Sequence, residues 1–423
     1  MPTASIISIG DELLRGRIVD TNFAWLAKRL FMLGIKVTHH STVPDKEEWI
    51  CAAFGDALQQ CDIAISIGGL GPTPDDVTRK GLSRFLGKEL VFDQRIALKI
   101  RERFAARGIE MPESNLAQAY LPEGATPIEN PEGTAPGIFF RRDDNRMIFL
   151  LPGPPREMKA VFHTIENILK HEFELNPLQN RVFRTIGVPE SIIEEWISRL
   201  SLPEGIDIGY YPSLRGVDIF LSAKNGEALL TANEIVSQKI EKYIFTIESE
   251  EKRIEEVIGE LLQKNGEAYS VAESCTGGLL SSWIVDVPGS SNYFLGGIVC
   301  YSNESKLKIL GVREKDIEEF GAVSPQVARQ MALGVRHKFN TTFGIGITGI
   351  AGPDGGTAQK PVGLVFIGFS NPESAIVRRY TFVGGREAIR TRAASAALNI
   401  LWVSLAHSDL INYPFKDGGE WIK

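Results

Sequence analysis

Short apolar runs alternate with amphipathic stretches through the first 173 residues of the chain. The runs "SIISIG", "IKVTHHSTV" and "DIAISIGG" have the length and the β-branched content of buried strands. Between the first two runs, apolar residues recur at helical spacing, at Val19, Phe23, Leu26, Leu30 and Leu33. This rhythm of strand, helix and strand predicts a mostly parallel sheet that helices cover on both faces. The rhythm closes with "RMIFLLPGPPREM", a strand followed by prolines and a helix.

The rest of the chain divides into a short mixed segment and a second alternating region. The mixed segment has too few elements for a full catalytic domain, and the later strands "FGIGITGI" and "PVGLVFIGF" mark the second region. We therefore expect the α/β fold class, with two three-layer α/β domains joined by a small α+β domain. The last residues show little periodicity and are expected to be a loose extension or an interface strap. The predicted parts are residues 1–173, 174–249, 250–412 and the tail 413–423.

The composition excludes several classes of function. The chain has 46 basic and 53 acidic residues, a net charge of −7, and no block of Lys and Arg that could follow a nucleic-acid backbone. Its four cysteines are scattered without CxxC spacing, so neither a zinc site nor a disulfide framework is indicated. The start "MPTASIISIGDELL" lacks the features of a signal peptide, and no apolar stretch reaches the length of a membrane span. We expect a soluble cytoplasmic protein that binds no nucleic acid and no membrane.

Two loops of the first domain carry carboxylates and glycines directly after predicted strands, in "SIGDELLRG" and "SIGGLGPTPDDVT". In an open parallel sheet, ligands bind beyond the carboxyl ends of the strands, so both loops should border one crevice. Clustered carboxylates favour a hard divalent cation such as Mg²⁺, and glycines let backbone amides approach a phosphate. The alternative is a turn and helix cap. The candidate metal ligands are Asp11, Glu12, Asp75 and Asp76, and the candidate nucleotide-binding residues are Gly68, Gly69, Gly71, Thr73 and Asp45.

In the second domain, "AESCTGGLL" lies where a strand should turn into a helix. Such a turn directs amide groups and small hydroxyls at one point, which suits an anion or a nucleophile that faces a carbonyl. The domain's two histidines lie mid-helix and in the tail, so a Ser-His-Asp triad is not available. A serine activated by a lysine remains. Ser274 is the first candidate nucleophile and Ser291 the second, and "VCYSNESKLK" supplies Tyr301 and Lys306 after another strand.

Two alternatives stay open for this loop. The hydroxyl of Ser274 can simply cap the following helix, which is a common role for serine. Cys275 and Cys300 lie close by, although a free thiol without a histidine partner is more often a packing residue. As a base, Lys306 would require a pKa well below the ordinary value of about 10.4.

Further residues around these motifs are candidates for substrate binding. The second glycine-rich loop, "ITGIAGPDGGTAQKPVG", offers hydroxyl and amide groups, and Lys360 and Arg386 could bind a phosphate. A solvent-exposed charge is the alternative for each of these two. The full set of substrate-binding candidates is Glu273, Thr276, Gly277, Gly278, Thr348, Gly349, Lys360 and Arg386.

The motifs "IISIGDELLRGRIVDTN", "GGLGPTPDDVTR" and "LPGPPREM" resemble the molybdopterin-binding-type domain of the competence/damage-inducible CinA family, and "AESCTGG" through "TGIAGPDGG" resembles its C-terminal amidohydrolase domain. The resemblance implies deamidation of nicotinamide mononucleotide to nicotinate mononucleotide and ammonia, with no cofactor. It also implies metal-dependent hydrolysis of ADP-ribose in the first domain. Asp45 matches an acidic position of relatives, or caps a helix. Two positions, Gly81 and Cys300, depart from the family pattern.

Two other functions compete with the deamidase. The first-domain pyrophosphatase could be the main activity, or the chain could be a nucleotide-binding regulatory protein with degenerate sites. We expect small-molecule nucleotides as ligands, and a homodimer because enzymes of this class are usually symmetric oligomers.

Overall fold

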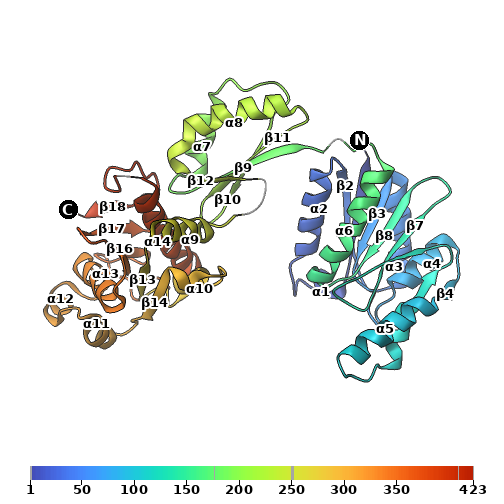
Figure 1. Cartoon of the computed structure of the whole chain (residues 1–423), viewed down its shortest axis with the longest axis horizontal. Coiled ribbons are helices and arrows are strands. Elements are labelled where there is room, and N and C mark those ends of the chain that lie inside the picture. Colours follow the sequence, from blue (N-terminus) through green and yellow to red (C-terminus); the bar gives the residue numbers. More distant parts are fainter. Residues whose placement is uncertain (1, 176, 249–251, 408, 423) are drawn as a thin grey trace. The chain divides into compact units, whose positions relative to one another are not determined.

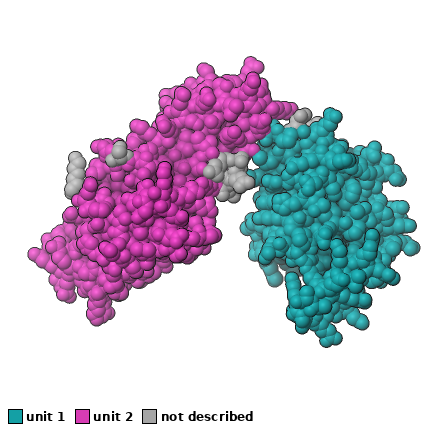
Figure 2. All heavy atoms as spheres, in the orientation of Figure 1, with its two compact units in different colours: residues 1–178 teal, residues 179–423 magenta. Residues whose placement is uncertain are grey.

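The computed structural model describes residues 2–175, 177–248, 252–407 and 409–422. The chain forms two compact units, Met1–Leu178 and Gln179–Lys423, which are coloured separately in Figure 2. The predicted small domain therefore clusters with the second α/β region.

Unit 1 is built on a six-stranded mixed sheet (Figure 1). Its first four strands are parallel, the fifth runs antiparallel to them, and the sixth runs antiparallel to the fifth. The carboxyl ends of the first four strands therefore meet at one edge, as the alternating pattern predicted. Across the sheet the strands are β2 (Lys36–Val43), β1 (Thr3–Ile9), β3 (Ile63–Ile67), β8 (Met147–Leu151), β7 (Gly137–Arg141) and β6 (Thr126–Ile128).

Helices cover both faces of this sheet and bury two separate apolar clusters. Helices α2 (Thr21–Met32) and α6 (Pro155–Glu172) cover one face. The other face carries α3 (Glu47–Gln60), α4 (Thr78–Leu86) and α5 (Gln94–Ala106). The predicted three-layer architecture is confirmed. The smaller elements are α1 (Asp11–Leu14), η1 (Glu113–Ala119), β4 (Leu90–Phe92) and β5 (Tyr120–Pro122).

Local chemistry fixes two details of unit 1. The Asp20 carboxylate accepts a hydrogen bond from the amide of Phe23 at 2.8 Å, and so caps α2. Gly81, which interrupts the helical pattern, lies where α4 packs on α3. A Cβ on Gly81 would come within 2.5 Å of the Ile50 side chain. The glycine therefore permits close helix packing.

Unit 2 begins with a small antiparallel sheet of four strands, packed against two helices as expected. Across this sheet the strands are β10 (Asp207–Pro212), β11 (Val217–Ala223), β9 (Gln179–Thr185) and β12 (Ile244–Glu248), and the helices are α7 (Glu190–Ser198) and α8 (Gly226–Ile240), with a short turn η2 (Glu241–Tyr243).

The rest of unit 2 is a second three-layer domain (Figure 1). Strands β14, β13 and β15 are parallel, whereas β16, β17 and β18 continue the sheet in antiparallel fashion. In spatial order the strands are β14 (Phe294–Val299), β13 (Tyr269–Glu273), β15 (Phe343–Gly349), β16 (Leu364–Ser370), β17 (Ala375–Thr381) and β18 (Glu420–Ile422).

Two groups of helices cover this sheet. One face packs against the first group and the other face against the second, each with its own apolar cluster. The first group is α9 (Ile254–Asn265), α10 (Leu279–Val285) and α14 (Arg386–Ala406), and the second is α11 (Asn303–Leu310), α12 (Glu314–Phe320) and α13 (Pro325–Phe339).

The tail, expected as a loose extension or an interface strap, is part of the folded sheet. Its strand β18 pairs with β17. Asp417 accepts a hydrogen bond at 2.7 Å from Arg378, a guanidinium that is buried among aromatic rings. The amide of Lys416 donates to the carbonyl of Gly187 at 2.7 Å, which ties the tail to the small sheet.

Candidate active site

Three parallel strands of the second α/β domain end at one edge of the sheet. Glu273 at the end of β13 lies beside Val299 at the end of β14 and Ile347 near the end of β15. The loops that follow these strands contain the three motifs that the sequence singled out. The topology therefore brings the motifs together, as expected for an α/β site.

Ser274 and Lys306 are in contact at this edge. Lys306 Nζ lies 3.1 Å from Ser274 Oγ, and also donates to the carbonyls of Cys300 at 2.8 Å and Tyr301 at 3.2 Å. Lys306 is positioned there by α11, which begins just before it. The Ser302 side chain caps this helix by accepting a hydrogen bond from the amide of Ser305 at 3.1 Å. The predicted serine and lysine thus meet across 32 residues of sequence.

The surroundings of Lys306 favour its neutral form. Only 1% of the residue is exposed, and burial lowers the pKa of its amine below the ordinary value. Within residues 252–407, all of which the structure describes, no carboxylate forms an ion pair with it. A neutral amine has two N–H donors and one lone pair. In the structure Lys306 Nζ donates to Ser274 Oγ and to both carbonyls. When the amine loses a proton, the two carbonyls can take the two remaining donors, which leaves the lone pair for the hydroxyl of Ser274.

Glu273, which was expected to bind substrate, instead forms hydrogen bonds with the backbone and side chain at the start of α10. Its side chain is fully buried, and its two carboxylate oxygens accept four hydrogen bonds. These come from the amides of Gly278 at 3.0 Å, Leu280 at 3.1 Å and Ser281 at 2.8 Å, and from the Ser281 hydroxyl at 2.7 Å. A carboxylate at a helix N-terminus satisfies amides that have no partner in the helix. Glu273 therefore fixes the start of α10 and does not face a ligand.

The turn after Ser274 keeps two amides available. The predicted donors Gly277 and Gly278 have left-handed φ angles of 60° and 92°, and their amides bond to Ser274 and Glu273. Among residues 252–407, the amide of Thr276 has no hydrogen-bond acceptor, and the amide of Cys275 has none apart from the thiol of its own side chain. These two amides, next to the serine, are the candidates for holding an oxyanion. The fully buried Thr276 hydroxyl is also without a partner in this described segment.

Two arginines that begin α14 tie the site loops together. Arg386 donates to the carbonyl of Gly352 at 2.7 Å and to the hydroxyl of Tyr301 at 3.3 Å. Arg390 donates twice to the carbonyl of Thr276, at 2.7 and 3.2 Å. Sequence reasoning missed Arg390, although its spacing of four residues from Arg386 in "GGREAIR" places both on one helix face.

The hydroxyl of Tyr301 does not lie beside Ser274 and Lys306, where the sequence analysis placed it as a candidate catalytic group. Its side chain is 62% exposed, and the hydroxyl contacts Arg386, whereas only its backbone carbonyl contacts Lys306. Within residues 252–407 the hydroxyl forms no hydrogen bond to Ser274. The structure thus separates the tyrosine hydroxyl from the serine and lysine pair.

Several other predicted residues lie elsewhere or have structural partners. Ser291 is in a short turn (η3, Ser290–Asn292) before β14, and so at the opposite edge of the sheet from Ser274. The structure therefore favours Ser274 over Ser291, and the choice of nucleophile stays a prediction. The Thr348 hydroxyl donates to the carbonyl of Ala322 at 2.8 Å. A Cβ on Gly349 would come within 2.8 Å of a neighbouring carbonyl, so this glycine serves close strand packing.

The remaining basic candidate, Lys360, also has an internal partner. Its amine donates at 2.5 Å to the carbonyl of Phe320, the last residue of α12. A cation at a helix C-terminus compensates unpaired carbonyls. Lys360 therefore stabilises the end of α12 and is not presented to a phosphate.

The cysteines beside the site are poor nucleophiles. Burial raises the pKa of the Cys275 thiol to about 12 and that of the Cys300 thiol to about 11. The thiolate is the reactive form of cysteine, so both side chains are inert near neutral pH. This supports the expectation that they are packing residues.

The predicted crevice in unit 1 is present. A cavity of about 290 Å³ lies beyond the carboxyl ends of β1, β3 and β8. Asp45 accepts a hydrogen bond from the amide of Asp11 at 2.9 Å. This bond links two loops, and the Asp45 side chain does not cap α3. Burial, and then the neighbouring carboxylates, raise the pKa of Asp45. The predicted residues that line the cavity are Glu12, Asp45, Gly68, Gly69, Asp75 and Asp76.

The remaining residues predicted for this crevice support its glycine-rich loop. Thr73 donates its amide at 2.8 Å and its hydroxyl at 2.5 Å to Asp76, and a Cβ on Gly71 would collide with that carboxylate. Arg79, which sequence reasoning missed, is buried and donates to the carbonyls of Leu70 and Gly71. Asp11 pairs with Arg15 at 2.5 Å.

The carboxylates of this crevice do not converge on one point. Across the ranges that the structure describes, no group of three or more His, Cys, Asp or Glu side chains is placed to hold a metal ion. The donor chemistry suits a hard cation, but the observed positions do not form its coordination shell.

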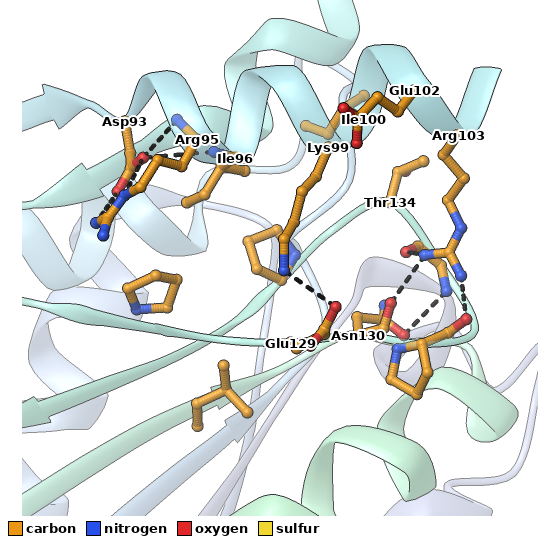
Figure 3. Close-up of a pocket in the computed structure, with 15 residues that line it drawn as sticks. Asp93, Arg95, Ile96, Lys99, Ile100, Glu102, Arg103, Glu129, Asn130 and Thr134 are labelled. Atoms are coloured by element: carbon orange, nitrogen blue, oxygen red, sulfur yellow. Dashed lines mark hydrogen bonds and ion pairs between the residues drawn. The ribbon is translucent and has the colours of Figure 1, made fainter. Parts of the chain in front are cut away.

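A larger cavity of about 710 Å³ lies between α5 and the loop before β7 (Figure 3). Lys99 and Arg103 extend from α5 towards this loop. Lys99 pairs with Glu129 at 3.0 Å, and Arg103 donates to loop carbonyls, among them that of Asn130 at 2.8 Å. These polar groups hold the loop on the helix and form no catalytic arrangement.

Comparison with known proteins identifies the family. Residues 251–405 match the CinA C-terminal domain, and residues 5–171 match a domain described as a probable molybdopterin binding domain. A competence-damage inducible protein of Caldicellulosiruptor saccharolyticus is 41% identical over 97% of this chain and 100% of its own length. The chain belongs to the CinA family. A CinA-like protein of Syntrophomonas wolfei is also 41% identical, over 95% of this chain and 98% of its own.

CinA proteins also occur among solved structures. One from Thermoplasma acidophilum is 36% identical to this chain and covers 40% of it and 98% of its own length, with a TM-score of 0.38. The family-model matches and the 41% identity over nearly the whole chain confirm the family resemblance that the motifs carried. None of the helices in the described ranges is both long enough and apolar enough to cross a membrane.

Proposed function

We propose that this CinA protein hydrolyses the carboxamide of nicotinamide mononucleotide to nicotinate mononucleotide and ammonia, with the serine and lysine of unit 2 as the catalytic pair. The observation that carries the proposal is the 3.1 Å contact between Ser274 Oγ and the buried amine of Lys306. Burial lowers the pKa of this amine, and in its neutral form the amine can take the proton of a serine hydroxyl, which makes the oxygen a nucleophile.

The proposed reaction proceeds in two halves. Ser274 Oγ attacks the carboxamide carbon while its proton passes to Lys306 Nζ, and the amides of Cys275 and Thr276 bind the oxyanion. Lys306 returns that proton to the departing nitrogen, so that ammonia leaves and an ester on Ser274 remains. Water then attacks the ester, again giving a proton to Lys306, which returns it to Ser274 Oγ as the acid departs. One water is consumed for each amide bond broken.

In this scheme the proton moves between Ser274 and Lys306 alone. The contact of the Tyr301 hydroxyl with Arg386 supports a role for the tyrosine in shaping the entrance to the site. A part for Tyr301 in proton transfer remains a prediction from the sequence.

The experiment is ammonia release from nicotinamide mononucleotide by the full chain in the presence of a chelator. Ser274→Ala and Lys306→Met should lower kcat on the order of a thousand-fold or more, because each removes one member of a catalytic unit. Lys308→Ala is the matched control: it lies on the same helix, pairs with Glu304 and should retain wild-type activity. Equal activity of wild type and Lys306→Met would disprove the proposed base.

We further propose ADP-ribose pyrophosphatase activity for unit 1. The observation that favours it is the crevice of about 290 Å³ at the strand ends, which carboxylates and glycine-rich loops line. The carboxylates would have to draw together to hold a divalent cation. Hydrolysis of ADP-ribose should need added Mg²⁺ and be lost in Asp76→Ala, while ammonia release persists. Hydrolysis that survives a chelator would contradict a metal-dependent site.

A further inference from the structure

One hairpin of the small antiparallel sheet presents an arginine to the second α/β domain. Arg215 lies in the turn between β10 and β11, where its amide donates to the Ser213 hydroxyl at 3.1 Å. Gly216 follows, and a Cβ at this position would collide with the carbonyl of Thr185 in β9. The turn is therefore packed closely on its own sheet, which gives Arg215 a fixed base.

Arg215 contacts each of the three helices α9, α10 and α14, which cover one face of the six-stranded sheet. Its guanidinium pairs with the carboxylate of Glu255 on α9, and lies 4.2 Å from the ring centre of Trp283 on α10. Its carbonyl accepts a hydrogen bond at 3.1 Å from the hydroxyl of Ser395 on α14. Among these helices, α10 directly follows the Ser274 loop, and α14 carries the arginines that bond to the site loops.

The ion pair fixes the position of the Arg215 guanidinium. The Glu255 side chain is 1% exposed, whereas that of Arg215 is 34% exposed. In the described part of the chain, the second carboxylate oxygen of Glu255 is buried without a hydrogen-bond partner. A buried carboxylate is costly when it loses its cationic partner. The small domain is therefore held to α9 through this pair.

The contact with Trp283 connects Arg215 to the proposed nucleophile. Trp283 lies on α10, a helix of seven residues. The first turn of this helix donates the amides of Leu280 and Ser281 to the carboxylate of Glu273, which directly precedes Ser274. A guanidinium over an aromatic ring is an attractive contact. Its loss should loosen α10, and with it the turn that contains Ser274.

We propose that Arg215 is a positioning residue for the deamidase site, through which the small domain holds α10 and the Ser274 loop in the arrangement that the reaction needs. The effect on deamidation rests on the proposed function, whereas the coupling between Arg215 and the loop does not. The small domain is thus a working part of the amidohydrolase and not merely a connector.

Hydrogen exchange of the full chain without substrate tests the coupling. In Arg215→Ala, the peptide that contains residues 274–285 should exchange about two- to thirty-fold faster, the range that mutations between coupled sites produce. Arg215→Lys keeps a charge for Glu255, and so keeps the small domain in place, but loses the planar group over Trp283, and should also speed exchange. Arg199→Ala is the matched control, because this arginine pairs with Glu195 inside the small domain. Wild-type exchange of the peptide in both Arg215 variants would overturn the proposal.

The kinetic test is a double-mutant cycle on kcat for nicotinamide mononucleotide. Arg215→Ala should lower kcat about two- to thirty-fold and leave KM nearly unchanged, because Arg215 acts through α10 and not on the substrate. Trp283→Leu should also lower kcat, and the double variant should lose no more than the weaker single variant, because both changes break one contact. Losses that multiply, or wild-type kcat in Arg215→Ala, would overturn the proposal. Faster exchange in the Arg215 variants of a protein that releases no ammonia would support the coupling and refute the deamidase alone.

Discussion

Replacing Glu273 by glutamine tests how the catalytic loop is held. The two carboxylate oxygens of Glu273 each accept two hydrogen bonds: one from the amides of Gly278 and Leu280, the other from the amide and hydroxyl of Ser281. A glutamine side chain has one oxygen and one NH₂ group. Whichever way it turns, the NH₂ group faces two donors and accepts neither.

The cost follows from the bonds that are lost. A hydrogen bond to a charged group contributes roughly 1.5–3 kcal/mol. Losing two of them, in a side chain with no solvent exposure, should destabilise the start of α10 by about 3–6 kcal/mol. Ser281→Ala is the matched control: it removes only one hydroxyl donor to the carboxylate and should cost roughly 1.5–3 kcal/mol, about half as much.

Hydrogen exchange measured by mass spectrometry is the appropriate assay, because a chain of several domains does not unfold in one step. In Glu273→Gln, the peptide that contains residues 278–285 should exchange on the order of a hundred-fold faster or more, since about 1.4 kcal/mol corresponds to a factor of ten. If Glu273 were a substrate ligand, exchange would stay at the wild-type rate and only KM for the mononucleotide would rise. That result would refute the structural role.

Three further predictions concern protonation, thiol reactivity and the second serine. Because burial lowers the pKa of Lys306, kcat/KM for ammonia release should rise with pH through a pKa below that of an ordinary lysine; a limb at the ordinary value of about 10.4 would contradict this. In the native protein at pH 8, iodoacetamide should modify the half-buried Cys51 before Cys275 and Cys300, as peptide mass spectrometry would show; equal labelling of all three would contradict the burial. Ser291→Ala should keep wild-type kcat and KM for the mononucleotide, because this serine lies at the far edge of the sheet; a large loss of kcat would reverse that assignment.

The fold was predictable because the spacing of apolar residues in strands and helices indicates which of their faces are buried. The same logic predicted the meeting of Ser274 and Lys306, since both follow the ends of parallel strands. Ser291 could have been excluded by the same argument, because it precedes its strand.

Other roles depend on contacts that spacing does not reveal. Glu273 looks like a site residue because it adjoins Ser274, yet the amides of α10 take up its carboxylate. The amine of Lys360 is not available to a ligand because it donates to the carbonyl of Phe320, at the end of a helix 40 residues away in sequence. In unit 1, the lengths of the loops alone do not show whether the carboxylates converge. Such outcomes follow from three-dimensional packing of loops, which the periodicity of strands and helices does not encode.

The most direct measurement of the central claim is detection of the ester on Ser274. The full chain is mixed with nicotinamide mononucleotide, quenched in acid during turnover and digested, and the mass of the peptide that contains Ser274 is measured by mass spectrometry. In a parallel reaction, hydroxylamine is added to intercept the acyl group. The account predicts a nicotinoyl nucleotide adduct on this peptide, or the matching hydroxamate as a product, and neither in Ser274→Ala. Ammonia release with an unmodified Ser274 peptide and no hydroxamate would contradict serine catalysis.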